Sequence, residues 1–535
     1  SPGEAPPAAR AAAADSCGSG PDALFELGLA LDEEGRYSEA AEAYRRCIHE
    51  GGKLGEAPAA AAAAWLNLGH ALHRTGRGSE AEAAWLQALR SSDSEAFVSG
   101  NAVLLSRGEV SFAPGSGGAA GGGDLQALRH ALGVVGAFDP ELLRKFGCAA
   151  GATGPELHRL RREAPAEAPA LTAAQEVFAR LFCVGAGVPL QTAETALAPA
   201  VMEVLRRHGL LLDVLDGLCV GAVQLFPFRG LLLATDWPSE TLGPAGDPVM
   251  AIGTDSLELC LCLGDGGCAG SCAAGSRVLD LCTGSGIGAL HAARCGASEV
   301  VAVDVSPRAC MFARANAELN GLRVAVRQGD LYEALGGGAG GGGREDAGRF
   351  DLILANPPFV AAPTGPSRVP TLYVDGGPDG LAVTARILRG APGRLVPGGG
   401  CVVEGEFPNV GASSPPQWLR SFGGASLTMV YAEAHVQSAE AYAADRGQTP
   451  GEVAEWHASL VEHGVSDMTS GLLVATFPPD DRPLEYRRVA WEAADADESW
   501  THEAQEDRGM RVVRDALASA LGRPCAHPVA DGKKK

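Results

Sequence analysis

The stretch from Arg277 to Leu322 reads RVLDLCTGSGIGALHAARCGASEVVAVDVSPRACMFARANAELNGL. It opens with a short apolar run, 278–281, followed by a glycine turn and an amphipathic segment, 287–295. A second apolar run, 300–304, ends in an acid and leads into another helical pattern. Short buried strands that alternate with amphipathic helices indicate a βαβ unit, whose ligand is expected at the carboxyl ends of the strands.

The glycine turn and the acid after it indicate a bound nucleoside. Gly284 and Gly286 let the backbone approach a ligand closely, because a side chain would fill that space. Asp304, at the end of the second strand, is placed to accept hydrogen bonds from ribose hydroxyls. The same turn also fits the loose dinucleotide fingerprint, so these residues alone leave a nicotinamide cofactor open.

Two further features favour a different cofactor. Asp280 precedes the glycine turn, where the cationic methionine end of S-adenosylmethionine needs an acid nearby. The apolar strand 350–355 runs directly into Asn356-Pro357-Pro358-Phe359. With this motif the chain resembles the class I S-adenosylmethionine-dependent methyltransferases that carry Asn-Pro-Pro-aromatic after their fourth strand.

The resemblance implies roles for the motif residues. The Asn356 side chain and the Pro357 carbonyl would accept hydrogen bonds from the target nitrogen, and the Phe359 ring would stack on the planar group that bears it. An amide or exocyclic amine is a poor nucleophile, because its lone pair is delocalised. Two acceptors on its hydrogens draw it toward tetrahedral geometry, and positioning and electrostatics then supply most of the acceleration.

The resemblance also implies further cofactor contacts. Asp330, after a third short strand, is the candidate for the adenine amino group, and Thr254 and Ser256 belong to a segment that closes over the cofactor. Cys282 departs from the family, since many relatives carry a glycine at this place in the turn. The Asp375–Leu381 stretch, DGGPDGL, resembles release-factor glutamine methyltransferases, whereas the order of domains is similar to methyltransferases related to the ribosomal-RNA guanine enzymes. The expected substrate is therefore a protein glutamine or an RNA base.

The N-terminal part contains an internal repeat. Leu27-Gly28 and Leu68-Gly69 occupy the same place in two copies, with large residues and later small residues at matching offsets. This pattern resembles the tetratricopeptide repeat, a helix pair that packs closely at the glycine. The repeats are expected to bind a protein partner or to dock within the chain.

The region before the catalytic core is expected to hold three helices, 173–182, 194–199 and 200–208, followed by a β-hairpin. That order is typical of a winged helix-turn-helix. The basic residues of the third helix number only three, so a packing or positioning role is favoured over DNA reading.

These patterns predict an α/β chain with a seven-stranded Rossmann-like core, preceded by helical repeats and a winged-helix-like segment. The expected divisions are a disordered tail 1–20, repeats 21–105, a linker 106–125, a winged-helix-like domain 126–245, a methyltransferase domain 246–480 with a helical insert 436–465, and an acidic C-terminal region 481–535.

Composition narrows the partners and the compartment. The 535 residues carry a formal net charge of −22, which argues against duplex DNA because phosphate contacts supply most non-specific affinity. No run of about 20 apolar residues indicates a membrane span. The 14 cysteines have no regular spacing, which favours reduced thiols and a cytoplasmic location. Cys260, Cys262, Cys268 and Cys272 lack paired zinc-ligand spacing, so no metal site is expected.

Two other functions stay open. The first is an adaptor whose methyltransferase domain binds cofactor without catalysis, although an intact acceptor motif speaks against it. The second is a nicotinamide oxidoreductase, which titration with either cofactor would distinguish.

Overall fold

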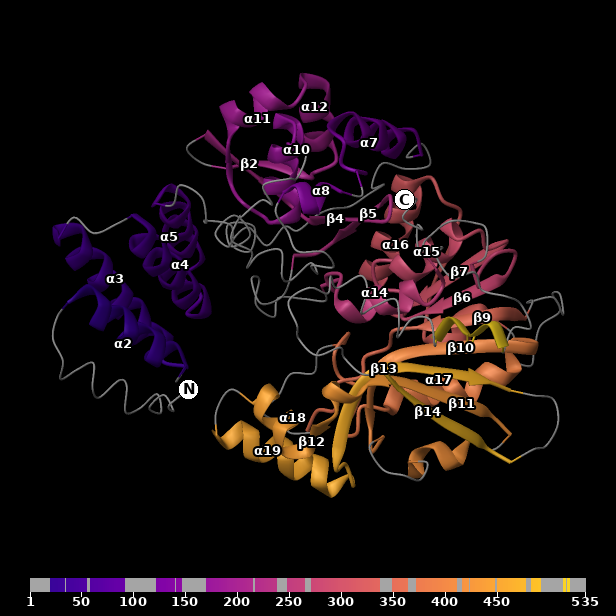
Figure 1. The fold of residues 1–535 in the computed structure, drawn as a ribbon. Coiled ribbons are helices and arrows are strands. Elements are labelled where there is room, and N and C mark those ends of the chain that lie inside the picture. The colour runs from indigo at the N-terminus through magenta and orange to yellow at the C-terminus, as the bar shows by residue number, and fades with distance from the viewer. Residues whose placement is uncertain are drawn as a thin grey trace, which may run out of the picture. The chain divides into compact units, whose positions relative to one another are not determined.

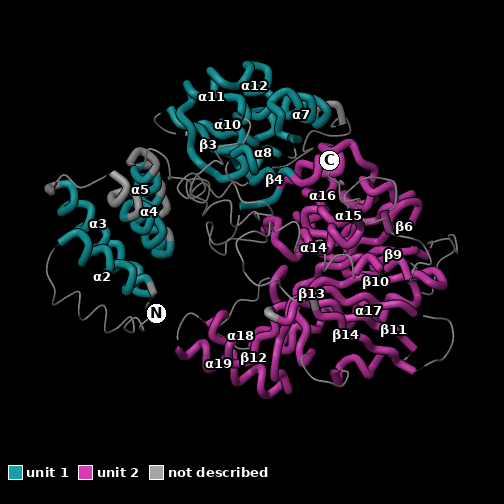
Figure 2. The backbone as a smooth tube through the Cα atoms, in the orientation of Figure 1, with its two compact units in different colours: residues 1–148, 154–227, 235–245 teal, residues 149–153, 228–234, 246–535 magenta. Residues whose placement is uncertain are grey.

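The structure is a computed structural model. It describes residues 20–33, 35–54, 58–91, 122–139, 141–146, 170–214, 217–237, 248–264, 271–336, 349–363, 372–410, 416–422, 424–447, 450–477, 483–491, 513–515 and 517–519. The expected tail 1–20 and linker 106–125 lie almost entirely outside these residues. The chain divides into two compact units, residues 1–148, 154–227 and 235–245 in one, and residues 149–153, 228–234 and 246–535 in the other (Figure 2).

The first unit begins with two helix pairs (Figure 1). Their helices are α2 (Pro21–Glu33), α3 (Tyr37–Leu54), α4 (Pro58–Arg74) and α5 (Gly78–Ser91). In the first pair Gly28 faces the Tyr44 ring, and in the second Gly69 faces Trp85, a fully buried side chain. A glycine is needed at both positions, because an added Cβ would lie 2.4 Å from the Tyr44 ring and 2.0 Å from Trp85 Nε1. The repeat expected from the sequence is therefore present as two antiparallel helix pairs.

The same unit contains a second group of elements. Its helices are α7 (Gly122–Val135), α8 (Leu142–Lys145), α10 (Ala173–Phe178), the π-helix η1 (Ala179–Cys183), α11 (Leu190–Ala196) and α12 (Pro199–Arg207). Its sheet has the order β1 (Val188–Pro189), β3 (Leu218–Gly221), β2 (Leu211–Val214). The β-hairpin expected after the helices is present: the chain leaves β3 at Gly221, and β4 (Gln224–Phe228) pairs with β5 (Leu231–Thr235).

The second unit is built on a large, mainly parallel sheet (Figure 1). Its order is β14-β11-β13-β10-β9-β6-β7-β8, with β12 pairing with β13. The strands are β6 (Arg277–Leu281), β7 (Glu299–Asp304), β8 (Ala325–Gln328), β9 (Phe350–Ala355), β10 (Leu395–Pro408), β11 (Ser426–Ala432), β12 (Gln437–Ser438), β13 (Asp467–Thr476) and β14 (Glu485–Trp491). Strands β6, β7, β8, β9 and β10 run parallel, whereas β13 is antiparallel to both of its long neighbours.

The α/β class expected from the sequence is confirmed, but the strand count differs. The described residues form nine strands rather than seven, because β12 and β14 join the sheet. Strand β14 pairs in parallel with β11 and lies in the region expected to be an acidic tail. The sequence of this strand, EYRRVAW, suits a sheet edge. The strand was not predicted because the acidic residues around it led the whole region to be interpreted as an acidic C-terminal region.

Helices cover both faces of this sheet. The alternation along β6 and β7 sends Val278 and Val300 into one apolar cluster and Leu279 and Val301 into another. The first cluster is completed by α14 (Thr254–Leu261) and α15 (Ile287–Arg294), and the second by α17 (Ala382–Gly390). The remaining helices are α16 (Pro307–Asn320), α18 (Ala439–Arg446) and α19 (Pro450–Glu462), with the 3₁₀ turns η3 (Leu331–Leu335), η4 (Ala391–Gly393), η5 (Gln417–Ser421) and η6 (Glu433–His435).

Two further expectations concern membranes and thiols. Among the described helices, none combines the length and hydropathy that a bilayer crossing requires. Nine described cysteines carry free thiols, as expected. The expectation of reduced thiols is wrong at Cys272, which is disulfide-bonded.

Candidate functional site

A cavity of about 380 Å³ opens at the carboxyl ends of β6, β7 and β9. This is the edge at which parallel α/β sheets bind ligands, and the volume is in the range of small-molecule sites. Residues from five segments far apart in the sequence line it, together with a few from 372–386. They are 248–250, 252, 255, 256 and 259; 280, 282–285, 287 and 288; 303–306 and 309; 329–331; 356–360; and 372–374, 383 and 386. The fold therefore brings the glycine turn and the Asn-Pro-Pro-Phe motif into one site.

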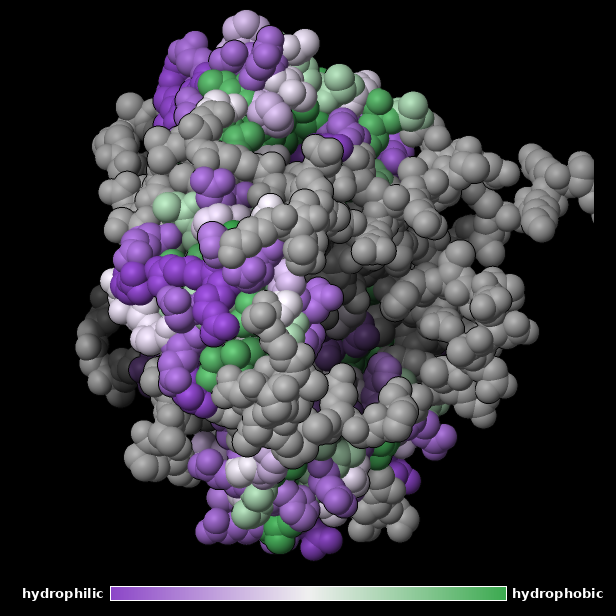
Figure 3. All heavy atoms as spheres, turned by 90° about the vertical axis from the view of Figure 1, so that its left-hand side faces the viewer, coloured by the Kyte–Doolittle hydropathy of each residue, from purple (hydrophilic) through white to green (hydrophobic). Residues whose placement is uncertain are grey.

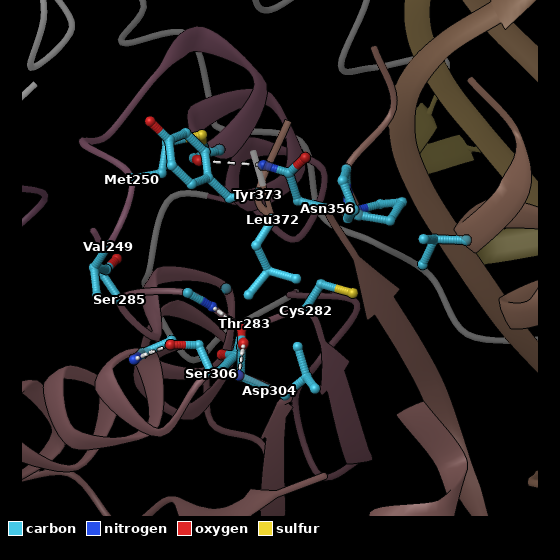
Figure 4. Close-up of a pocket in the computed structure, with 18 of the residues that line it drawn as sticks. Val249, Met250, Cys282, Thr283, Ser285, Asp304, Ser306, Asn356, Leu372 and Tyr373 are labelled. Carbon is cyan, nitrogen blue, oxygen red and sulfur yellow. Dashed lines mark hydrogen bonds between the residues drawn. The ribbon is translucent and has the colours of Figure 1, made fainter. Parts of the chain in front are cut away.

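The cavity has two ends of different chemistry. Figure 4 shows Asn356 and Tyr373 at one end, Thr283, Asp304 and Ser306 at the other, and Leu372 between them. The end near Asp304 follows β6 and β7, where a ribose would be held, and the end near Asn356 follows β9. A cofactor bound at the first end would thus present its reactive group toward the second.

Asp280 is enclosed beneath the glycine turn. It is 2% exposed, and its Oδ2 accepts hydrogen bonds from Thr283 Oγ1 at 2.5 Å and from the Ala289 amide at 2.9 Å. Burial raises the pKa of this carboxyl to about 7, although both hydrogen bonds act in the opposite direction. A cationic ligand would stabilise the ionised form, so the site fits a ligand with positive charge close to this acid.

Asp304 fixes the turn as well as facing the cavity. Its Oδ2 accepts from the Gly284 amide and its Oδ1 from the Ser306 amide, both at 2.9 Å. An ionised carboxylate has about four acceptor sites, and Asp304 also lines the cavity, where the hydroxyls of a ribose would meet it. Ser306 in turn begins α16, where its side chain accepts a hydrogen bond from the Ala309 amide.

The glycines of the turn have different functions. Gly284 has a φ of +54° and lines the cavity, and no atom lies within 4 Å of the position that a Cβ would take. Gly286 is not among the lining residues, all of which the structure describes. Its φ is +89°, and a Cβ there would lie 2.8 Å from Leu290 Cδ1 and 3.1 Å from Ala313. A cofactor contact at Gly286 stays a prediction, and a glycine at this position also allows α15 and α16 to pack closely.

Cys282 has a left-handed backbone, with a φ of +57°. Glycine adopts this conformation without strain, so the glycine that the resemblance leads us to expect at this position would fit the turn. The cysteine side chain lines the cavity, and burial raises the pKa of its thiol. It is therefore a neutral, apolar part of the wall.

The segment before the core contributes Asp255 and Ser256. Both line the cavity from the first turn of α14, whereas Thr254 is exposed and does not line it. Successive helical residues point about 100° apart, so only part of this turn can face the site. A cofactor contact at Thr254 stays a prediction, whereas Asp255, which was not expected from the sequence, lines the cavity.

Asp255 holds the acceptor motif. Asn356 Nδ2 donates to Asp255 Oδ2 at 2.9 Å and approaches Ser256 Oγ at 3.3 Å (Figure 4). An ionised carboxylate only accepts hydrogen bonds, so it turns the amide nitrogen of Asn356 toward itself. The amide oxygen is left as the acceptor that a substrate would meet.

Three glycines close around Phe359. A Cβ on Gly376 or Gly380 would lie 2.7 Å or 2.4 Å from the Phe359 backbone, and one on Gly405 would lie 3.3 Å from Phe359 Cβ. The DGGPDGL stretch is also joined to the motif by backbone hydrogen bonds, Val360 N–H to Val374 O and Gly376 N–H to Val360 O, each at 2.9 Å. These glycines are required because two loops and a strand meet at the aromatic residue.

The remaining expected residues also line the cavity. Pro357 and Phe359 lie beside Asn356, and Ser256 and Asp330 complete the expected set. Asp330 lies opposite Arg386, whose guanidinium donates to its Oδ2 at 2.7 Å. Both side chains are nearly half exposed, so the pair is a weak surface ion pair that a ligand could displace.

A buried acid lies behind the acceptor end. Glu404, on β10, is 2% exposed, and its Oε2 has no hydrogen-bond partner among the described residues. Burial, with the nearby charges of Glu258 and Asp255, raises the pKa of Glu404 well above its usual value. Burial therefore favours the protonated, uncharged form of Glu404.

The fold and the site together define an α/β domain with a cavity for a nucleoside cofactor and a second, hydrogen-bonding end. Residues 271–404 match the family described as the methyltransferase small domain, and residues 21–48 match the tetratricopeptide repeat. These two segments are thus similar to a methyltransferase small domain and to a tetratricopeptide repeat.

Proteins with similar sequences match only part of the chain. The chain is 44% identical over 137 residues to the ribosomal protein uL3 glutamine methyltransferase of Bradyrhizobium diazoefficiens, covering 24% of this chain and 40% of that protein. It is 43% identical over 138 residues to the release factor glutamine methyltransferase of Bordetella pertussis, covering 24% of this chain and 48% of that protein. The chain thus spans less than half the length of these two relatives.

Among solved structures, the ribosomal protein L11 methylase of Lactobacillus delbrueckii subsp. bulgaricus is similar at 22% identity and a TM-score of 0.19. That likeness covers 30% of this chain and 61% of the other.

Proposed function

We propose that the protein is an S-adenosylmethionine-dependent N-methyltransferase that acts on the side-chain amide of a protein glutamine. The observation that carries the proposal is the hydrogen bond from Asn356 to Asp255, which presents an amide oxygen at one end of a cavity whose other end suits a nucleoside. Relatives that are 43–44% identical over part of the chain are named as glutamine methyltransferases, which supports the same acceptor chemistry here.

The residues present fit S-adenosylmethionine. Asp304 has acceptor capacity for the ribose hydroxyls, Asp280 suits the cationic end, and Gly284 leaves open space in the wall. Asp330 remains the candidate for the adenine amino group, which would compete with Arg386 for the carboxylate. When bound, the cofactor supplies an electrophilic methyl group on a positively charged sulfur.

The chain's own residues would position the acceptor. The Asn356 side-chain oxygen and the Pro357 carbonyl accept the two hydrogens of the target amide, and the Phe359 ring packs on its plane. The cofactor, held by Asp280 and Asp304, would supply its methyl group to the nitrogen lone pair that these residues position. One N–H proton leaves to solvent, and the amide regains its conjugation.

Charge in the cavity favours a protein over RNA. Four carboxyl residues line it, Asp255, Asp280, Asp304 and Asp330, and Arg386 is the only cationic side chain among the described lining residues. A neutral amide enters such a site without penalty, whereas a polyphosphate backbone near it would be repelled.

The experiment is transfer of radiolabelled methyl from S-adenosylmethionine to cell extract, to purified release factor and to ribosomal protein uL3. Wild type is compared with Asn356→Ala and with Gln417→Ala, a control that removes an exposed amide elsewhere on the unit. We expect label that protease removes and ribonuclease does not, lost in Asn356→Ala and kept in Gln417→Ala.

Label removed by ribonuclease would make RNA the substrate instead. Cofactor binding without any transfer would favour the second candidate, an adaptor that binds cofactor and recruits partners through its repeats. Equal labelling by wild type and Asn356→Ala would contradict the role given to the motif.

A further inference from the structure

The insert between β11 and β13 packs directly on the chain that leaves the acceptor motif. Its apolar cluster contains Tyr442 and Trp456 from its two helices together with Ala361 and Ala362, which follow Phe359. Tyr442 is 1% exposed, and Ala361 and Ala362 are 1% and 3% exposed. The insert is therefore part of the wall that supports the acceptor end, and not a separate appendage.

A chain of hydrogen bonds joins the two segments. The Ala361 amide donates to Tyr442 Oη at 3.2 Å, and Tyr442 Oη donates to Glu406 Oε2 at 2.5 Å. Arg446, one turn further along α18, donates to Glu406 Oε1 at 2.5 Å and lies 4.4 Å over the Tyr442 ring. The Glu406 and Arg446 side chains are 12% and 29% exposed, so the pair is largely shielded from water.

The carboxylate of Glu406 strengthens the hydrogen bonds of Tyr442. A hydroxyl that donates to a carboxylate forms one of the stronger hydrogen bonds and becomes a better acceptor for the next donor. Nearby negative charge and burial raise the pKa of Tyr442, with burial the larger cause, so the phenol keeps its proton. The hydroxyl is thus fixed in one direction, with Ala361 as its donor.

The three amides after Phe359 are all engaged, from two sides. Val360 donates to the oxygen of Val374, just before the DGGPDGL loop, and Ala362 donates to the oxygen of Gly377 within it, each at 2.9 Å. Ala361, whose amide points the other way in an extended chain, depends on Tyr442. The backbone beside the aromatic ring is therefore held on one face by a loop and on the other by the insert.

The insert's outward side has a different character from its packed side. At the lower end of the view in Figure 3, where its helices lie, most of the surface is hydrophilic, with a few apolar residues among them. Val461 of α19 is 58% exposed. The inner side of the insert is buried and hydrogen-bonded, and its outer side is mostly hydrophilic. This arrangement suits an element that supports the chain after the acceptor motif.

We propose that Tyr442 and Glu406 are positioning residues for the acceptor: they fix the Ala361 backbone from the insert and thereby set the place of Phe359 against the target amide. This inference rests on the proposed function. Neither residue lines the cofactor cavity, so cofactor affinity does not depend on them.

The test compares Tyr442→Phe with Tyr486→Phe. Each change removes one buried phenol hydroxyl from the same unit. The Tyr442 hydroxyl is hydrogen-bonded, whereas Tyr486 Oη has no hydrogen-bond partner among the described residues. The first measurement is amide hydrogen exchange in peptides that cover residues 356–363. We expect exchange at Ala361 to accelerate about tenfold or more in Tyr442→Phe, which corresponds to the loss of about one hydrogen bond, and to stay at the wild-type rate in Tyr486→Phe.

The second measurement is methyl transfer to the acceptor protein that wild type labels. In Tyr442→Phe we expect KM for that acceptor to rise at least fivefold, while the calorimetric Kd for S-adenosylmethionine keeps its wild-type value. Glu406→Gln, which retains an oxygen acceptor for the phenol, should give a smaller rise. A merely structural role would instead lower the melting temperature without separating KM from cofactor Kd.

The outcomes are distinct. Unchanged exchange at Ala361, or accelerated exchange with unchanged acceptor kinetics, overturns the inference and leaves the proposed function in place. A wild-type protein that binds cofactor but labels no acceptor overturns the proposed function, and the inference falls with it.

Discussion

Asn356 Nδ2 lies 2.9 Å from Asp255 Oδ2, although the two residues are 101 positions apart in the chain. Asn356 follows the central strand β9, and Asp255 lies in the first turn of the helix that precedes the sheet. The orientation of the Asn356 amide therefore depends on α14 as well as on the Asn-Pro-Pro-Phe motif.

Removal of this partner should lower turnover without loss of cofactor. In Asp255→Ala the Asn356 amide can rotate, and a misplacement of about 1 Å in a reacting geometry lowers rates by about 100-fold. We expect kcat to fall about 10- to 100-fold while the Kd for S-adenosylmethionine changes little. Asp255→Asn keeps an oxygen that accepts from Asn356 and should retain most of the activity. An equal loss of kcat in both variants would mean that turnover depends on the charge of Asp255 and not on the orientation of the Asn356 amide.

The elements that carry strong local signals were predicted from the sequence. Strands β6, β7 and β9 are continuous apolar runs, each followed by a turn signal or an acid, and such runs specify a buried parallel strand within a few residues. The same runs place Asp280, Asp304 and Asn356 at one edge of the sheet. The candidate site follows from local pattern together with parallel topology.

The parts that depend on long-range packing were missed. Asp255 and Thr254 are adjacent, and only the angle at which α14 meets β10 decides which one faces the cavity. The function of Gly286 is set by Ala313 of another helix, and β14 belongs to the sheet because β11 presents an edge to it. No local periodicity contains this information.

Gly284 and Gly286 should respond differently to the same methyl group. In Gly286→Ala the new Cβ lies 2.8 Å from Leu290 and 3.1 Å from Ala313, at a φ of +89°. Overpacking and backbone strain together should lower the free energy of unfolding by about 3 kcal/mol. In Gly284→Ala no atom lies within 4 Å, so only the strain of about 1–2 kcal/mol remains.

Gly284→Ala should lose more cofactor affinity than Gly286→Ala, although it should lose less stability. The methyl group of Gly284→Ala enters the cavity and should weaken S-adenosylmethionine binding at least tenfold, whereas Gly286→Ala, where still folded, should bind normally. Denaturant unfolding and calorimetry measure the two quantities separately. Similar cofactor affinity in both variants would contradict the separate functions given to these glycines.

The repeat region offers a test that is independent of catalysis. In Gly69→Ala the Cβ would lie 2.0 Å from Trp85 Nε1, which donates to Leu66 O at 3.2 Å. Displacing this buried ring should destabilise the helix pair by about 3 kcal/mol. In Gly52→Ala, within α3, nothing lies within 4 Å, and the change should stabilise the helix by up to about 1 kcal/mol.

Thermal unfolding followed by circular dichroism measures both repeat variants, and cofactor Kd should be unchanged in each. A melting temperature for Gly69→Ala equal to that of wild type would mean that α4 and α5 do not pack at this glycine in solution.

The pH dependence of cofactor affinity should report the ionisation of Asp280. Its pKa in the free protein is raised to about 7 by burial, and the unfolded value is close to 4. The folded state therefore binds this proton more tightly than the unfolded state does. The resulting stability is fully present below pH 4 and is lost as the pH rises through 7.

A cationic ligand beside Asp280 favours the ionised carboxylate, so its binding must release the proton when the pH is below 7. The affinity for S-adenosylmethionine should then increase by up to about tenfold per pH unit between pH 5 and 7 and level off above pH 7. Glu404→Gln removes the other raised carboxyl near the site and should leave this dependence intact, which assigns it to Asp280. Calorimetry at constant ionic strength measures the profile, and an affinity that stays flat from pH 5 to 8 would show that no cationic group of the ligand lies against this acid.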